Sequence, residues 1–280
     1  MTSYEDTLDR FRLSAQGSPE AVPLARLALL VSQVEYPDLD IASYERRLLS
    51  LSQSLEVRIH PAADTRTQLA ELHKLLFDEC AFRGNELEYN DPKNLYINDV
   101  IDRATGIPAT LAVIYVTVAQ RAGIRALPVG LPSRVIVRID SSDGPVFIDP
   151  FDRGRELTED ECKSIVRSVY GRRNQWREHF LDPITPRQLI QRLIHNLKAT
   201  YLQRADEERA GRMIELLLAM YPWDLDEIRD RGMLRERIGS YDEALEDLEQ
   251  YVRYRIGARD IQTVTEAVRS LRRQTGAGPN

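Results

Sequence analysis

Apolar residues recur every three or four positions through the first third of the chain, which is the spacing of a helix with one buried face. Ser18-Pro19-Glu20 predicts the start of the first helix, with Ser18 as the N-cap and Pro19 in the first helical position. The pattern predicts that this helix ends at Tyr36-Pro37, that a second spans residues 41–57, and that a third follows Asp64. The positions expected to face inward are Leu24, Leu27, Ala28, Val31, Tyr44, Leu48, Leu49, Leu51, Leu55, Leu69, Leu72, Leu75, Leu76 and Cys80.

After Phe82 the pattern changes to closely spaced Gly, Asn, Asp and Pro, which is typical of an ordered, turn-rich loop. Asn94 is a candidate N-cap for a short helix that runs through Asp102. Pro108 suits the first turn of the next helix, because a first turn leaves its N–H groups unpaired. Residues 109–122 are almost wholly apolar, so we expect a helix that is buried on most sides and ends at Gly123.

Three short runs predict β-strands at residues 125–130, 134–140 and 145–148. The last two are joined by Ser141-Ser142-Asp143-Gly144, a hairpin signal because Asp-Gly tolerates the positive φ of a tight turn. These runs predict an antiparallel sheet packed on the central helix. A further helix is expected to begin at Thr158-Glu159-Asp160-Glu161, which has the spacing of a capping box.

The polar, arginine-rich stretch at residues 171–186 is the best candidate for a linker, and the chain beyond it has a helical pattern. Residues 197–224 align with 231–258 at an offset of 34, the period of tetratricopeptide repeats. The second copy has Gly239-x-Tyr241-x-x-Ala244 between two helices, whereas the first copy is degenerate and has Asp206 where the glycine would stand. We expect five parts: a helical segment (1–60), a core (61–170), the linker (171–186), repeats (187–273) and a disordered tail (274–280).

The composition argues against several classes of protein. The formal net charge is −6 and no run of basic residues occurs, which argues against nucleic-acid binding. The longest apolar stretch near the N-terminus, residues 21–31, is too short to span a membrane, and acidic residues precede it, so a cytoplasmic location is expected. The two cysteines, Cys80 and Cys162, lie far apart, so neither a disulfide scaffold nor a cysteine-based zinc site is expected.

Several longer motifs occur in one order between about residues 69 and 271. They are Phe82-x-Gly84-Asn85, Tyr89-x-Asp91-Pro92-x-Asn94-x-Tyr96-x-Asn98, Gly106-Ile107-Pro108-x-Thr110-Leu111, Asp149-Pro150-Phe151-Asp152-x-Gly154, Arg229-Asp230-Arg231-Gly232 and Asp247-Leu248-Glu249-x-Tyr251. Together they resemble the SirB-type transglutaminase-like/tetratricopeptide family. The resemblance implies a mostly helical α+β fold, in which a degenerate transglutaminase-like (papain-type) core with a small antiparallel sheet precedes tetratricopeptide-like repeats.

Transglutaminase-like enzymes carry a Cys at a helix start, a His on the next long strand and an Asp on the strand after it. The spacing from Gly106 to Gly123 puts Pro108 at the Cys position, as in the SirB-type family generally. That family commonly has Pro-Gly-His on the second strand, whereas Arg134 stands at the His position here and only Asp149 remains. Proline has no nucleophile and arginine stays protonated, so the triad chemistry is not available at this site.

Other residues leave further possibilities open. Cys80 is a candidate nucleophile with His60 or His73 upstream, but His73 lies roughly 10 Å away along the same predicted helix. Arg134 and Asp149 are expected to form an ion pair, which either stabilises the fold or binds a ligand. The candidate cleft residues are Arg83, Asn85, Asn94, Arg134, Asp149 and Asp152, although Asn and Asp in loops also satisfy backbone groups.

The sequence therefore predicts a non-catalytic protein that acts as an interaction or regulatory scaffold, with no cofactor and no metal site. We expect a protein partner, because helical repeats stack into surfaces that hold peptides or proteins. We expect neither nucleic acid nor membrane as a partner. Tyr201, Trp223 and Tyr241 are the candidate partner surface, and core packing explains such aromatic residues equally well. The alternatives are a residual hydrolase or transferase that uses Cys80, or a small-ligand site in the vestigial cleft.

Overall fold

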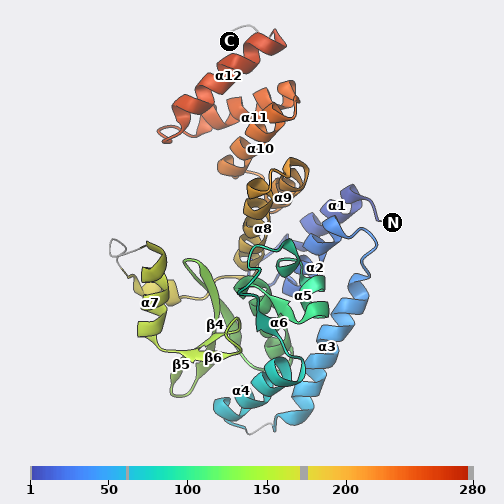
Figure 1. Ribbon diagram of the computed structural model, residues 1–280, viewed down its shortest axis with the longest axis vertical. Helices are drawn as coiled ribbons and strands as arrows, with labels where there is room; N and C mark the ends of the chain where they lie inside the picture. The colour runs from blue at the N-terminus through green and yellow to red at the C-terminus, as the bar shows by residue number, and fades with distance from the viewer. Residues whose placement is uncertain (1, 61–62, 171–175, 277–280) are drawn as a thin grey trace. The chain divides into compact units, whose positions relative to one another are not determined.

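The computed structural model describes residues 2–60, 63–170 and 176–276, and Figure 1 shows the course of the chain. The chain divides into two compact units, Met1–Asn196 and Leu197–Asn280. The fold is mostly helical, with a small sheet in the first unit. The five-part division expected from the sequence stays a prediction, and residues 277–280 of its tail lie outside the described ranges.

Four helices open the first unit: α1 (Tyr4–Ser14), α2 (Leu24–Glu35), α3 (Ile41–Arg58) and α4 (Thr65–His73). The predicted span of α3 is confirmed to within one residue. The predicted start of α2 is wrong, because Ser18-Pro19-Glu20 forms a turn in which the N–H of Ala21 donates to the carbonyl oxygen of Ser18. The Ser18 hydroxyl hydrogen-bonds to Glu20 instead of capping a helix, and α2 begins at Leu24.

The buried face of α3 matches the predicted pattern in part, since Tyr44 and Leu51 are only half-buried. Leu48 and Leu55 are fully buried, whereas Leu49 is 43% exposed. Successive residues of a helix point roughly 100° apart. Leu49 therefore lies beside the buried stripe and faces solvent, so the prediction that it faces inward is wrong.

The helix after Asp64 changes geometry along its length. Asp64 caps α4 by accepting a hydrogen bond from the N–H of Thr67 at 2.7 Å. From residue 74 the chain continues as a π-helix, η1 (Lys74–Glu79), which ends at Cys80. Leu69, Leu72, Leu75 and Leu76 are buried as expected, but Cys80 is only partly buried.

The predicted short helix is present as α5 (Ile97–Arg103). The turn-rich loop also contains short elements that the sequence did not indicate: β1 (Arg83–Gly84), the 3₁₀ helix η2 (Pro92–Asn94) and β2 (Thr105–Gly106), which pairs in parallel with β1. Asn94 does not cap α5, because it is fully buried at the end of η2 and Tyr96 precedes the helix.

The central helix α6 (Pro108–Arg121) lies against an antiparallel sheet, as predicted, but the sheet has a fourth strand that the sequence did not indicate. The strands, in spatial order, are β3 (Ala126–Leu131), β4 (Arg134–Ser141), β5 (Gly144–Asp149) and β6 (Arg155–Leu157). The hairpin is confirmed. Ser141 pairs with Gly144, and Gly144 has a φ of +118°. Residues 108–119 are all buried, so α6 is enclosed by the elements around it.

The opposite face of the sheet is covered by α7 (Glu159–Tyr170), whose Cys162 and Val166 pack on Val129 and Ile136 (Figure 1). The predicted capping box is present, since the N–H of Thr158 donates to Glu161 at 2.8 Å and the N–H of Glu161 donates to Thr158 Oγ1 at 3.3 Å.

Residues 171–175 of the predicted linker lie outside the described ranges. The rest of that stretch contains a 3₁₀ helix, η4 (Glu178–Leu181). It then lies alongside β3, where the N–H of Ile184 donates to the carbonyl oxygen of Pro128 at 2.8 Å. The next helix, α8 (Pro186–Gln203), contains the division between the two units.

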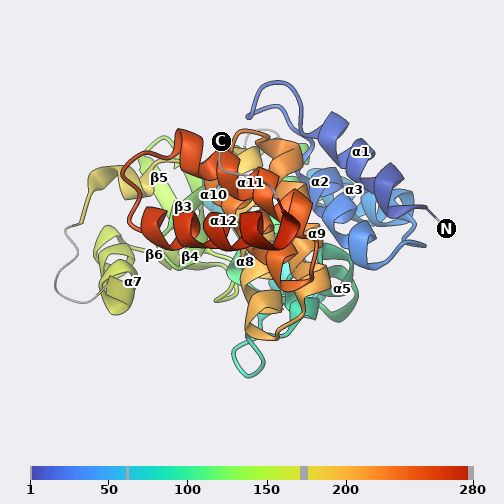
Figure 2. The same cartoon turned by 90° about the horizontal axis from the view of Figure 1, so that it is seen from above.

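The second unit continues with α9 (Glu207–Met220), α10 (Leu225–Arg237), α11 (Tyr241–Tyr254) and α12 (Ile261–Thr275), and the last three are seen from above in Figure 2. The repeat is visible in the helix ends, because α11 begins and ends 34 residues after α9. Gly239 and Ala205 occupy equivalent turns with φ of +85° and +54°. The residue at the glycine position of the first copy is therefore Ala205, whereas Asp206 caps α9.

In the described ranges, none of the helices combines the length and the hydropathy that crossing a bilayer requires.

Candidate functional site

The start of α6 is the position where transglutaminase-like enzymes carry their nucleophile, and in this protein it is buried. Pro108 is the first residue of α6 and is buried. Thr110 Oγ1 accepts a hydrogen bond from the N–H of Ile107 at 3.1 Å and donates to the carbonyl oxygen of Asn94 at 2.8 Å. A β-carbon at Gly106 would lie 2.7 Å from Thr110 Oγ1, so only glycine fits there. This motif therefore builds the helix start and presents no reactive group.

Two asparagines beside the helix start hold the loop that follows β1. Asn85 Nδ2 donates to Asn94 Oδ1 at 3.1 Å, and Asn94 Nδ2 donates to the carbonyl oxygen of Glu88 at 2.6 Å. Asn85 Oδ1 accepts from the N–H of Glu88 at 3.0 Å. Both side-chain amides are thus engaged within the loop, which is the structural alternative that the sequence left open.

Arg134 and Asp149 form the expected ion pair, with Arg134 Nη1 2.5 Å from Asp149 Oδ2. Asp149 is fully buried, and its other oxygen accepts the N–H of Phe151 at 3.0 Å. Burial raises the pKa of Asp149, while Arg134 and the N–H groups of Phe151 and Asp152 act in the opposite direction. The Arg134 side chain remains 29% exposed.

Phe151 joins this ion pair to the loop. The Arg134 guanidinium carbon lies 5.2 Å from the centre of the Phe151 ring, and the Tyr89 ring centre lies 6.1 Å from it. Gly84 also packs against the Phe151 ring, since a β-carbon added at Gly84 would lie 2.6 Å from that ring. Burial raises the pKa of Tyr89, opposed by the positive charges of Arg134 and Arg192. Gly84, Tyr89, Arg134 and Phe151, which come from three separate parts of the sequence, thus converge at this point.

Two of the candidate cleft residues do not join the cluster through their side chains. Arg83 is exposed and contributes its backbone, whose N–H donates to the carbonyl oxygen of Ala104 at 2.9 Å. The Asp152 carboxylate accepts from Arg155 Nε at 2.6 Å on the surface. The convergent set is therefore Asn85, Asn94, Arg134 and Asp149, together with Tyr89 and Phe151.

Cys80 lies in a separate small pocket of about 270 Å³, which it lines with Leu48, Leu51, Phe82 and Ile101. Burial raises the pKa of the Cys80 thiol, which lowers the fraction of reactive thiolate. His73 Nε2 is hydrogen-bonded to the Tyr115 hydroxyl at 2.9 Å, and burial lowers the pKa of His73 to about 4. His73 is thus engaged by Tyr115 and is a weak base.

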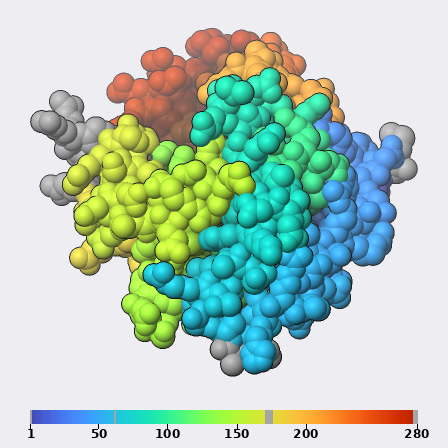
Figure 3. Space-filling view, turned by 60° about the horizontal axis from the view of Figure 1, so that its bottom comes forward, coloured from blue at the N-terminus to red at the C-terminus, as the bar shows by residue number. Residues whose placement is uncertain are grey.

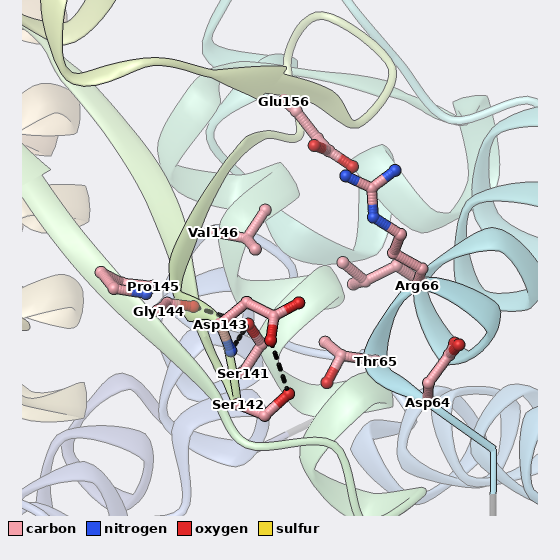
Figure 4. A pocket seen from close by; sticks show the side chains of 11 residues that line it. Asp64, Thr65, Arg66, Ser141, Ser142, Asp143, Gly144, Pro145, Val146 and Glu156 are labelled. Atoms are coloured by element: carbon pink, nitrogen blue, oxygen red, sulfur yellow. Dashed lines mark hydrogen bonds between the residues drawn. The ribbon is translucent and has the colours of Figure 1, made fainter.

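A polar pocket of about 190 Å³ lies between the start of α4 and the β4–β5 hairpin, side by side in Figure 3. Arg66 and Glu156 point toward one another across it (Figure 4). The Ser141 hydroxyl is turned to the carbonyl oxygen of Gly144 at 2.6 Å, within the hairpin itself. Of the pocket residues named here, the sequence marked only Ser141 and Gly144, as parts of a turn signal. Within the described ranges, no group of three or more His, Cys, Asp or Glu side chains could hold a metal ion.

The three candidate partner residues do not share one surface. Tyr201 is buried, with 4% of its surface exposed, whereas Trp223 and Tyr241 are 74% and 42% exposed. Trp223 precedes the first turn of α10 and Tyr241 follows its last turn, so about 20 Å of helix separates them. Trp223 and Tyr241 are therefore separate exposed positions, and Tyr201 is part of the packed interior.

Comparison with known proteins agrees with this architecture. Residues 42–195 match the family model described as Transglutaminase-like superfamily, and residues 197–269 match a tetratricopeptide repeat model. The fold and the site thus define a transglutaminase-like domain followed by tetratricopeptide repeats.

The relatives make the family more specific. A UPF0162 protein of Xylella fastidiosa (strain Temecula1) is 32% identical over 248 residues, which cover 88% of each chain. The UPF0162 protein YchA of Escherichia coli (strain K12) is 28% identical over 78% of this chain and 80% of that one. The mouse F-box only protein 21 is 28% identical over 55% of this chain but only 25% of its own length. The chain belongs to the UPF0162 family of the Transglutaminase-like superfamily.

Proposed function

We propose that this chain is a non-catalytic member of its superfamily and acts as an interaction or regulatory scaffold. The observation that carries the proposal is the ion pair of Arg134 with the buried Asp149, at the position where the enzymes have a His–Asp pair. A guanidinium has five N–H donors and no acceptor, so it cannot take a proton from a nucleophile.

The nucleophile position supports the same proposal. Pro108 has no reactive side-chain atom and is buried at the start of α6. Asp149 is held by Arg134 and by backbone N–H groups, so its oxygens already have partners. What remains of the triad therefore stabilises the turn after β5 and offers no group for acyl transfer.

The second unit supplies the reason to expect a protein partner. Its helices repeat at the tetratricopeptide period, and repeats of this kind build extended surfaces that hold peptides and proteins. Trp223 is 74% exposed between α9 and α10, and exposed tryptophan is enriched among residues that dominate binding energy.

The experiment compares turnover and partner binding in the same preparation. The full chain is assayed for amine transfer to a glutamine peptide and for peptide hydrolysis, as wild type and as Cys80→Ala. A partner is captured by cross-linking in cells of the source organism, purified, and its affinity measured for both proteins. We expect no turnover and equal affinities. Turnover that disappears in a folded Cys80→Ala variant would establish an enzyme and overturn the proposal.

A further inference from the structure

Two loops lie at the same end of the repeats in the second unit. Residues 221–224 join α9 to α10, and residues 255–260 join α11 to α12, at equivalent places in successive copies. Arg255 Nη2 lies 3.2 Å from Asp226 Oδ2, which ties the second loop to the first turn of α10. The two loops therefore form one continuous surface.

This loop surface exposes an unusual amount of apolar area. Trp223 is 74% exposed, Tyr254 63% and Ile256 92%. Exposed apolar residues that occur singly need no explanation, but three large ones on two adjoining loops and the helix end between them are typical of an interaction site. An aromatic ring and an aliphatic side chain of this kind are suited to anchor a partner.

The acidic groups around these residues already have partners. Asp226 is shared by Arg255 and Arg229, and Asp260 accepts from Arg229 at 2.7 Å and from the Tyr251 hydroxyl at 2.6 Å. Asp224 accepts the N–H groups of the first turn of α10.

Two arginines of the same surface remain uncommitted. Arg253 and Arg259 are exposed, and neither has an ion-pair partner in the part of the chain that the structure describes. Two guanidinium groups thus flank an apolar patch whose own carboxylates are occupied, which favours a ligand that brings negative charge.

We propose that the loop surface, made of Trp223, Arg253, Tyr254, Ile256 and Arg259, binds an acidic peptide segment with an aromatic or aliphatic anchor residue. This inference rests on the proposed scaffold function and names the chemistry of the partner. The anchor packs on Trp223 and Ile256, and carboxylates of the segment pair with Arg253 and Arg259. A membrane is the less favoured occupant, because two free arginines fall short of the 4–8 basic residues typical of such sites.

The test uses the full chain and a phage-displayed library of random dodecapeptides as the probe. Enriched peptides are synthesised with a fluorescent label, and their binding to the wild type and to each variant is followed by fluorescence anisotropy. The test variants are Trp223→Ala and the charge reversal Arg253→Glu/Arg259→Glu. The matched control is Ile238→Ala, at an exposed apolar residue that caps the other end of α10.

We expect enriched peptides that combine Asp or Glu with an aromatic or aliphatic residue. Each test variant should weaken binding at least about tenfold, which corresponds to about 1.4 kcal/mol, while the control binds as the wild type does. Added salt should weaken binding further, because the pairs are exposed.

Two results would overturn the inference. One is the absence of any enriched peptide; if phosphatidylserine vesicles then bind in a way that depends on Trp223, the occupant is a membrane. The other is enrichment of peptides whose binding all three variants leave unchanged; this would reject the loop surface and leave the scaffold function standing. The scaffold function itself fails only through the turnover assay on Cys80→Ala.

Discussion

At the scale of single residues, the feature that matters most is Arg134, which stands at the position of the triad histidine and cannot accept a proton. The resemblance to the family put Arg134 and Asp149 at the His and Asp positions on neighbouring strands and so predicted their pairing, and the structure has that pair at 2.5 Å. The sequence could not show that Phe151 packs against both Arg134 and Tyr89, because that contact depends on the path of the turn after β5. Nor could it show that Asn85 and Asn94 are engaged by each other and by backbone, since a pattern does not reveal the direction of a side chain.

The ion pair predicts a non-additive effect on stability. Arg134→Gln leaves the buried Asp149 carboxylate without its counter-charge and should lower the free energy of unfolding by about 3 kcal/mol. The double variant Arg134→Gln/Asp149→Asn removes both charges and should recover much of that loss. Urea denaturation of wild type, both single variants and the double variant measures the coupling. Additive losses would show that the two side chains act separately.

His73 predicts a pH dependence. Burial lowers the pKa of His73 to about 4, whereas an unfolded chain has a histidine pKa near 6.5. The unfolded state therefore binds more protons in this window, so stability is full above pH 6.5 and decreases as the pH falls toward 4, by up to about 3 kcal/mol.

His73→Gln keeps a hydrogen-bonding side chain next to Tyr115 but does not titrate. Its stability between pH 6.5 and 4, measured by urea denaturation at each pH, should decrease less steeply than that of the wild type. The same slope in both proteins would mean that His73 is not the group responsible.

At the scale of elements, the sequence predicted those whose signal is local and periodic. The spans of α3 and α6 and the β4–β5 hairpin follow from apolar spacing, a first-turn proline and Asp-Gly. The start of α2 was missed because Ser18-Pro19-Glu20 also fits a turn, and only packing chooses between the two. The strand β6 was missed because three residues give no period, and it forms by pairing with β5.

The turn between the paired helices of each repeat predicts opposite effects for two matched substitutions. Ala205 has a φ of +54°, a conformation that costs a residue with a β-carbon about 1 kcal/mol and costs glycine almost nothing. Ala205→Gly should therefore stabilise the protein by up to that amount. Gly239→Ala, at the equivalent turn with φ of +85° and open space around the added carbon, should destabilise it similarly.

Thermal unfolding of the two variants beside the wild type measures both effects. Because nothing else lies near the added β-carbon of Gly239→Ala, a loss there reports backbone strain alone. If both variants lose stability, the Ala205 turn is held by contacts that outweigh its strain, and the argument from φ is wrong.

At the scale of the whole molecule, the sequence predicted that the transglutaminase-like part precedes the repeats, because the motifs of the two parts occur in that order along the chain. The exposure and spacing of the candidate partner residues could not be predicted, since Tyr201 is buried and Tyr241 lies beyond the far end of α10 from Trp223. Burial depends on how helices pack, which a repeat period alone does not specify. Each unit nevertheless has its own apolar clusters, one formed by the sheet and α7 and others formed by α9 to α12.

A buried charge cluster in the second unit predicts where in the molecule a defect appears. Lys198 Nζ lies 2.6 Å from Glu227 Oε2 and 2.6 Å from Asp230 Oδ2, and Lys198 and Glu227 are almost fully buried. Lys198→Met keeps the volume of the side chain and removes the charge that compensates Glu227. This should lower the free energy of unfolding of the second unit by about 3 kcal/mol.

Hydrogen exchange of the full chain measures where the loss falls. Amides of α10 and α11 should exchange faster, by up to about 100-fold for a change of about 3 kcal/mol, while those of β3 to β5 keep the wild-type rate. The matched control is Lys163→Met, since Lys163 pairs with Glu159 and Asp160 on the exposed side of α7 and should change nothing measurable. Faster exchange of the sheet to the same extent would show that the two units unfold as one, because a defect confined to one set of apolar clusters reaches the other only through cooperative unfolding.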